Sequence, residues 1–167
     1  RFDKHLALKL AAACHACYSL YQAPEQFAPP DGYHLIDRFP VSMNGISDFG
    51  YLAVSDREAI LAFRGTQKTE EWIANAVFSQ SEFCYVPNAG HVHSGFLYIY
   101  QQMRDRIVNV VGELPGSMKL LVTGHSLGGA LATLAVADLA WHYVGSQVNL
   151  YTFASPRVGD RDFVEFF

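Results

Sequence analysis

Ser126 is the residue whose surroundings point most directly to chemistry. It lies between Gly124 and Gly128 in the stretch 119–140, KLLVTGHSLGGALATLAVADLA, where an apolar run gives way to an alanine- and leucine-rich one. The pattern G-x-S-x-G holds a nucleophilic serine at a sharp turn when a strand precedes it and a helix follows it. The hydrophobic pattern predicts both elements here, so we interpret Ser126 as a nucleophile.

The physics of such a turn explains why small residues flank the serine. The turn strains the backbone of the nucleophile and brings neighbouring chain segments close, which suits Gly124 and Gly128. The start of the following helix directs free N–H groups towards the same point. The N–H of Leu127 is therefore a candidate oxyanion donor. A glycine-rich turn with an incidental serine is the alternative interpretation.

The elements that must position this turn follow from the periodicity of apolar residues. We predict helices over 4–21, 91–114 and 128–144, a final loop leading into a helix within 157–167, and strands over 33–41, 48–56, 59–63, 119–123 and 147–156. Strands that alternate with helical segments indicate α/β architecture with a parallel sheet. With 167 residues, the chain is long enough for one domain, 1–167, with a real core.

Composition limits the classes of function. Half of the residues are hydrophobic, the net charge is −4, and lysine and arginine do not cluster, which argues against nucleic acid as a partner. No apolar stretch reaches the ~18 residues of a membrane span, so we expect no transmembrane segment. The sequence starts at Arg1, as after removal of a signal peptide or at the boundary of a longer chain.

The three cysteines carry no clear chemistry. Cys14 and Cys17 have CxxC spacing but lie inside the predicted helix 4–21, and Cys84 stands apart. Redox CxxC pairs follow a strand and open a helix, and zinc would need a second pair of ligands. We expect Cys14 and Cys17 to be small buried helix residues, with redox or metal chemistry as the alternative.

Four segments in order resemble the class 3 (fungal-type) lipases of the α/β-hydrolase fold. They are AFRGT with EEWIAN shortly after it, VHSGF ahead of a helix, VTGHSLGGALA, and YTFASPRVGD. The resemblance implies a mostly parallel sheet with flanking helices and hydrolysis of carboxylic esters through an acyl-enzyme, without metal or organic cofactor. It favours an ester lipid substrate, triacylglycerol first, with phospholipid and soluble esters left open.

The resemblance also assigns a second oxyanion donor. Thr66 in the segment AFRGT matches the family position that supplies it, through its backbone N–H and its hydroxyl. Removal of one such donor typically lowers turnover about 10²- to 10³-fold. The alternative is a plain strand end, in which Arg64 makes a structural salt bridge and Thr66 starts a turn.

Residues 67–81 match the position of the family's lid. Trp72, Ile73 and Val77 share one face of a predicted amphipathic helix, which could cover an apolar site in water and open at a lipid–water interface. An ordinary amphipathic helix packed permanently on the core is the alternative.

His91 and His93 share one face if they lie on a strand, as a metal pair would. No third ligand is evident in the sequence, and zinc would need one. In the family the histidine that matches His93 is structural, and we prefer that interpretation.

The triad is incomplete within this sequence. The fold requires an acid and a histidine after the serine, in that order. Asp138 and His142 lie too far along the predicted helix, ~18 Å and ~24 Å from the serine. His125 adjoins the serine and should point elsewhere, and Asp160 and Asp162 follow one strand too early.

We therefore expect the triad Asp and His outside this chain, in a remaining C-terminal part of the same protein. The ending FVEFF supports this, because Phe163, Val164, Phe166 and Phe167 would be largely uncovered on a terminal half-helix. A non-catalytic module that binds lipid or a partner is the alternative. The family is often secreted, which favours secretion, with a cytoplasmic location left open.

Overall fold

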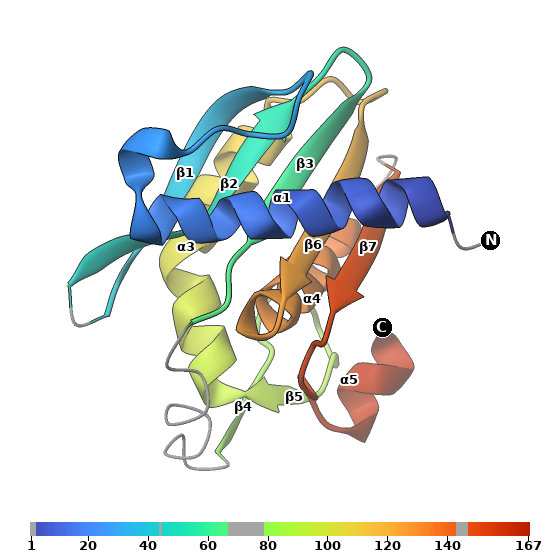
Figure 1. Cartoon of the computed structure of the whole chain (residues 1–167). Helices are drawn as coiled ribbons and strands as arrows, with labels where there is room; N and C mark the ends of the chain where they lie inside the picture. Colours follow the sequence, from blue (N-terminus) through green and yellow to red (C-terminus); the bar gives the residue numbers. More distant parts are fainter. Residues whose placement is uncertain (1–2, 44, 67–78, 143–146) are drawn as a thin grey trace.

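The computed structural model describes residues 3–43, 45–66, 79–142 and 147–167 (Figure 1). The helices are α1 (Lys4–Gln22), a short 3₁₀ helix η1 (Pro24–Gln26), α3 (Ser94–Gly112), α4 (Leu127–His142) and α5 (Arg161–Phe166). The strands are β1 (His34–Ser42), β2 (Ile46–Val54), β3 (Glu58–Phe63), β4 (Gln80–Glu82), β5 (His91–His93), β6 (Lys119–His125) and β7 (Val148–Phe153).

Five of the strands form a mixed sheet in the order β1-β2-β3-β6-β7. The first three pair antiparallel, and β3, β6 and β7 run parallel, with Phe63 opposite Gly124 and Gly124 opposite Thr152. Helix α4 connects β6 to β7, as a parallel pair requires. The carboxyl ends of the parallel strands therefore meet at one edge, where β4, β5 and α5 also lie (Figure 1). The α/β-hydrolase fold class is confirmed.

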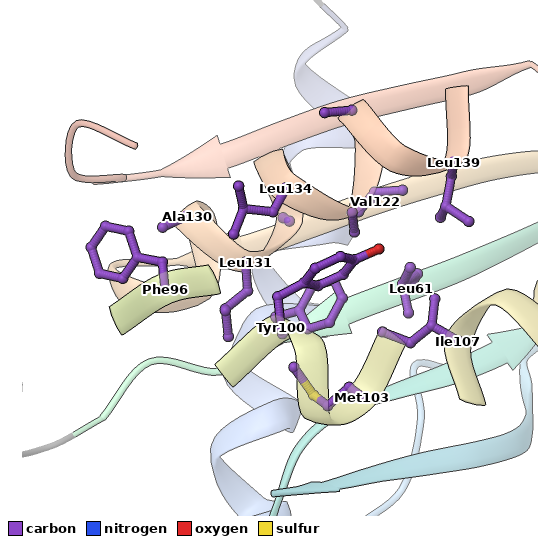
Figure 2. Packing of buried hydrophobic residues seen from close by; sticks show 14 of the residues in the cluster. Leu61, Phe96, Tyr100, Met103, Ile107, Val122, Ala130, Leu131, Leu134 and Leu139 are labelled. Carbon is purple, nitrogen blue, oxygen red and sulfur yellow. The ribbon is translucent and has the colours of Figure 1, made fainter. Parts of the chain in front are cut away.

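Helices cover both faces of the sheet, with α1 on one and α3 and α4 on the other (Figure 1). The α1 face carries Tyr51, Ala53, Ile60, Ala62 and Leu121, and the other face carries Leu52, Leu61, Phe63 and Val122. This alternation makes β3 and β6 continuous apolar runs, because strands between two helical layers are buried on both sides. In Figure 2, Tyr100 and Met103 of α3 lie in the same cluster as Leu131 of α4.

A buried ion cluster fixes α3 against α4. Asp138 is fully buried and accepts hydrogen bonds from the Tyr100 hydroxyl at 2.8 Å and from Arg104 at 2.8 Å and 3.2 Å. Burial raises the pKa of Tyr100 well above its usual value, so the hydroxyl stays a donor. The Asp138 carboxylate is thus satisfied as a structural group, because buried charges are stable only when paired and hydrogen-bonded.

Most predicted elements are confirmed within one to three residues, and two expectations were wrong. Residues 91–93 form β5, which pairs with β4 (the latter not predicted), and α3 begins only at Ser94. Phe163 is 2% exposed rather than uncovered, because its ring packs edge-on against Phe83 with centroids 5.6 Å apart. Val164 and Phe167 are exposed, as expected, whereas Phe166 is half-buried and packs against the core.

The cysteine expectation is confirmed for the helical pair. Cys14 and Cys17 are buried on α1, whereas Cys84 is exposed. Burial raises the pKa of Cys14 to about 11 and that of Cys17 well above its usual value, so both thiols stay protonated near neutral pH. In the parts of the chain that are described, no helix combines the length and apolarity needed to cross a membrane.

Candidate active site

Ser126 occupies a strained turn between β6 and α4. Its φ is 56°, in the left-handed region that costs a residue with a side chain roughly 1–2 kcal/mol. Two hydrogen bonds hold it there: its N–H donates to the Phe153 carbonyl at 2.9 Å, and its own carbonyl accepts from the Gly129 N–H at 2.8 Å. The strand–turn–helix context that the motif needs is present.

The two glycines around the serine are required by backbone contact. A Cβ on Gly124 would lie 2.0 Å from the Gly128 carbonyl oxygen, and a Cβ on Gly128 would lie 2.3 Å from the Phe63 carbonyl oxygen. These neighbours are backbone atoms, which cannot rotate away as a flexible side chain could. The motif therefore brings the ends of β3 and β6 and the start of α4 into direct contact.

Leu127 is the first residue of α4, and its side chain is fully buried. Its N–H belongs to the first turn, where backbone donors have no partner four residues back in the helix. The positive end of the helix dipole lies at the same place. The start of α4 therefore places a backbone N–H and the positive end of a helix dipole next to Ser126.

The end of β3 lies against the serine turn. A Cβ on Gly65 would lie 3.4 Å from Cβ of Ser126 and 3.1 Å from the His125 carbonyl oxygen. Thr66 follows directly and is half-buried. The fold thus brings the Gly65–Thr66 peptide close to Ser126, although 60 residues separate Thr66 from Ser126 in the sequence.

Arg64 is 4% exposed, and its guanidinium bonds neutral oxygens. Nε donates to the Asp48 carbonyl at 2.7 Å, Nη1 to the Gly65 carbonyl at 2.9 Å, and Nη2 to the Ser47 hydroxyl at 3.0 Å. Burial lowers the pKa of Arg64, but an arginine keeps its charge at neutral pH. Among the described residues, Arg64 therefore does not form the salt bridge that the alternative interpretation of the sequence expected.

Tyr18 of α1 also reaches the turn. Its hydroxyl lies 2.8 Å from Nδ1 of His125 and would be 2.8 Å from a Cβ on Gly65. Cys14, one helical turn earlier, contacts the Thr123 hydroxyl at 3.2 Å. One turn of helix and two residues of strand span nearly equal lengths, so α1 and β6 match in this register. Sequence reasoning missed Tyr18, because its partner His125 is 107 residues away in the sequence.

A hollow of about 520 Å³ lies at the same edge of the sheet. Its wall is formed by Ser79, Gln80, His93, Phe96 and the loop 156–161 that follows β7. This loop starts next to the serine turn, because a Cβ on Gly129 would lie 2.8 Å from Cβ of Ser155. The hollow is large enough for part of a small organic ligand.

Several of the acids and histidines considered as triad members have other partners in the structure. The His125 ring contacts Tyr18, as expected from its pointing away, and His142 lies 3.0 Å from the Tyr85 carbonyl oxygen. His91 contacts Asp160 at 3.2 Å, where Asp160 caps α5 by accepting from the Phe163 N–H.

His93 has a structural contact. It is the N-cap of α3, accepts from the Gly95 N–H through Nδ1 at 3.1 Å, and stacks on Phe96. Among the described residues, no group of three or more histidine, cysteine or acidic side chains is arranged to hold a metal ion. The proposed lid residues Trp72, Ile73 and Val77 lie outside the described residues.

Comparisons of this chain with known proteins all lead to lipases. A family model described as Lipase (class 3) matches residues 60–167. The secreted mono- and diacylglycerol lipase 1 of Fusarium solani is 38% identical over 113 residues, which cover 66% of this chain and 33% of that protein. A lipase of Rhizomucor miehei is 38% identical over 120 residues, which cover 67% of this chain and 32% of that protein.

A solved structure, lipase II from Rhizopus niveus, superposes with a TM-score of 0.81 and 31% identity, covering 97% of this chain and 66% of that one. The matched part of the chain covers about a third of the length of the two curated relatives from Fusarium solani and Rhizomucor miehei. The family match includes the serine turn, the end of β3 and the loop after β7. The chain belongs to the class 3 lipase family.

Proposed function

We propose that this protein hydrolyses carboxylic esters of lipids through an acyl-enzyme on Ser126. The observation that carries the proposal is the geometry of the turn: a serine with a positive φ at a strand-to-helix junction, with the Gly65–Thr66 peptide packed against it. A strained turn of this kind projects the serine Oγ above the end of the sheet, where a substrate carbonyl can reach it.

The proposed mechanism gives a role to the Ser126 hydroxyl and to two backbone N–H groups. Oγ of Ser126 attacks the ester carbonyl carbon while a histidine takes its proton, and the N–H groups of Thr66 and Leu127 stabilise the resulting oxyanion. The intermediate then expels the alcohol, which receives the proton from that histidine, and water releases the acid from the acyl-enzyme in the same way. The histidine and the acid that orients it are proposed to lie outside these 167 residues.

Acylglycerols are the proposed substrates. The Fusarium solani relative is named for mono- and diacylglycerols, and the apolar residues Phe96, Pro156 and Val158 on the wall of the hollow suit an acyl chain. Triacylglycerol is the first candidate within this class. Trp72, Ile73 and Val77 are proposed to cover the site in water and to open at a lipid–water interface. Secretion is proposed from the names of the secreted relatives.

The test is labelling of the native protein with a fluorophosphonate, which reacts with activated serines, together with release of fatty acid from tri-, di- and monoacylglycerol. Labelling of the wild type but not of Ser126→Ala, with fatty acid released only by the wild type, is the expected result. A folded wild-type protein that is neither labelled nor active would contradict the proposal and would favour the non-catalytic binding module.

A further inference from the structure

Arg64 lies beside the proposed oxyanion site and belongs to none of the roles assigned above. We propose that Arg64 is a positioning residue that holds the Gly65–Thr66 peptide in the orientation in which Thr66 can donate to the oxyanion. This inference rests on the proposed function, and its test is designed so that the two can fail separately.

The argument starts from the planarity of the peptide bond. The carbonyl of Gly65 and the N–H of Thr66 belong to one peptide unit, and the described residues contain no cis peptide bonds. In a trans peptide these two groups point in opposite directions from the same rigid plane. The hydrogen bond from Nη1 of Arg64 to the Gly65 carbonyl, at 2.9 Å, therefore also fixes where the Thr66 N–H points.

The glycine makes this restraint necessary. A side chain at position 65 would be crowded, because its Cβ would lie 2.8 Å from the Tyr18 hydroxyl and 3.1 Å from the His125 carbonyl oxygen, so glycine fits this position without any shift of its neighbours. A glycine permits many more backbone conformations than other residues, so the peptide that follows it can rotate more easily. The Leu127 donor differs, because the first turn of α4 already fixes its direction.

The guanidinium is itself rigidly held, which a positioning group requires. It donates to the Asp48 carbonyl and the Ser47 hydroxyl, and its Cζ lies over the rings of Tyr21 and Phe49, 4.6 Å and 3.9 Å from their centroids. The Arg64 N–H donates to the Phe49 carbonyl at 2.9 Å. The side chain thus transmits the position of β2 and α1 to the peptide beside the nucleophile.

The charge of the guanidinium adds a second effect. A cation bonded to a carbonyl oxygen polarises the whole peptide unit, which makes its N–H a stronger donor. A purely structural clamp would need neither the charge nor the bond to Gly65. The two interpretations therefore differ in what a substitution of Arg64 changes: loss of a positioning group lowers kcat, whereas loss of a purely structural group lowers only the amount of folded protein.

The experiment measures kcat and KM of the native protein and its variants on a soluble ester, with the concentration of active sites counted by fluorophosphonate titration. Arg64→Gln removes the charge and the three-way clamp. Its kcat per active site is expected to fall about 10- to 100-fold, with KM unchanged within about twofold, because loss of a whole donor costs about 10²- to 10³-fold.

Ser47→Ala is the matched control. It removes one hydrogen bond of the same guanidinium but leaves the bond from Nη1 to Gly65, so its kcat is expected to stay within about twofold of the wild type. A boronic acid, which forms a tetrahedral adduct with the serine, should lose affinity for Arg64→Gln by the same factor as kcat, because both depend on the oxyanion donors.

Wild-type kcat in folded Arg64→Gln, or an equal loss in Ser47→Ala, would overturn the positioning role. If Arg64→Gln does not fold, the wild-type protein provides the test. The hydrogen bond from Nη1 of Arg64 to the Gly65 carbonyl oxygen should give an NMR coupling between Nη1 and the carbonyl carbon, and the absence of this coupling would contradict the inference. Ser126→Ala separates the two proposals, because an active Ser126→Ala protein overturns the function whatever Arg64 does.

Discussion

Ser126 and Asp138 lie at the two ends of one short segment, and the structure holds these two polar residues in opposite ways. Ser126 is kept in a strained conformation by backbone contacts, with the Ser126 N–H bonded to the Phe153 carbonyl. Asp138, twelve residues later on α4, is fully buried and accepts hydrogen bonds from Tyr100 and Arg104. The proposed nucleophile is held by its backbone, which leaves its side chain available for reaction, whereas the structural charge has its side chain satisfied.

The largest expected effect is on the reactive side of this comparison. Ser126→Ala should lower ester hydrolysis about 10⁴-fold or more, because the nucleophile is lost, while the free energy of unfolding changes by less than about 1 kcal/mol. Turnover of a soluble ester and urea unfolding of the same preparations measure the two quantities. An active Ser126→Ala protein, or one that is strongly destabilised, would show that the turn is structural.

The next effect tests whether backbone contact alone holds the turn. Gly128→Ala places a Cβ 2.3 Å from the Phe63 carbonyl oxygen, so β3 must move away from α4. We expect a loss of about 3 kcal/mol in the free energy of unfolding and a fall in kcat of about 100-fold in the remaining folded protein. Gly116→Ala, where an added Cβ meets nothing within 4 Å, is the control and should change neither quantity appreciably.

For Asp138, the structural residue of this comparison, we expect a loss of stability without a loss of turnover. Asp138→Asn removes the charge from the cluster with Tyr100 and Arg104 and should lower the free energy of unfolding by about 3 kcal/mol. Its kcat per active site, measured well below the melting temperature, should stay within about twofold of the wild type. A selective fall in kcat with unchanged stability would mean that Asp138 acts in the reaction after all.

The smallest effect comes from an aspartate–arginine pair at the surface, in which the arginine is exposed and the aspartate is half-buried. Asp37 accepts two hydrogen bonds from Arg106, and the side chain of Arg106 is 53% exposed. The Arg106 hydrogen bond holds the pKa of Asp37 below its usual range. Solvent screens such a pair, so Asp37→Asn should cost less than about 1 kcal/mol.

The sign of the pH dependence follows from the lowered pKa of Asp37. Its contribution is fully present above the unfolded pKa of about 3.9 and is lost as the pH falls through the lower folded pKa. Urea unfolding at several pH values below 5 measures it: the stability difference between wild type and Asp37→Asn should shrink as the pH falls. A constant difference would show that the carboxylate charge contributes nothing.

Much of the fold could be predicted from local patterns. Continuous apolar runs predicted β3 and β6, because a strand buried between two helical layers is apolar on both faces, and the spacing of apolar residues predicted α1 and α4. The short pair β4 and β5 was missed, since three residues per strand are too few for a period. Phe163 seemed uncovered because its partner Phe83 is remote in sequence.

By itself, the sequence determined the serine turn, since Gly124, Ser126 and Gly128 act through contacts within one short segment and the adjoining strand. Only the tertiary structure decided that the end of β3, a tyrosine on α1 and the Arg64 guanidinium meet at that turn. Tyr18 and His125 are 107 residues apart, and Arg64 bonds residues 16 and 17 positions away. Such partners leave no period in the sequence, because they are set by how strands and helices align in space.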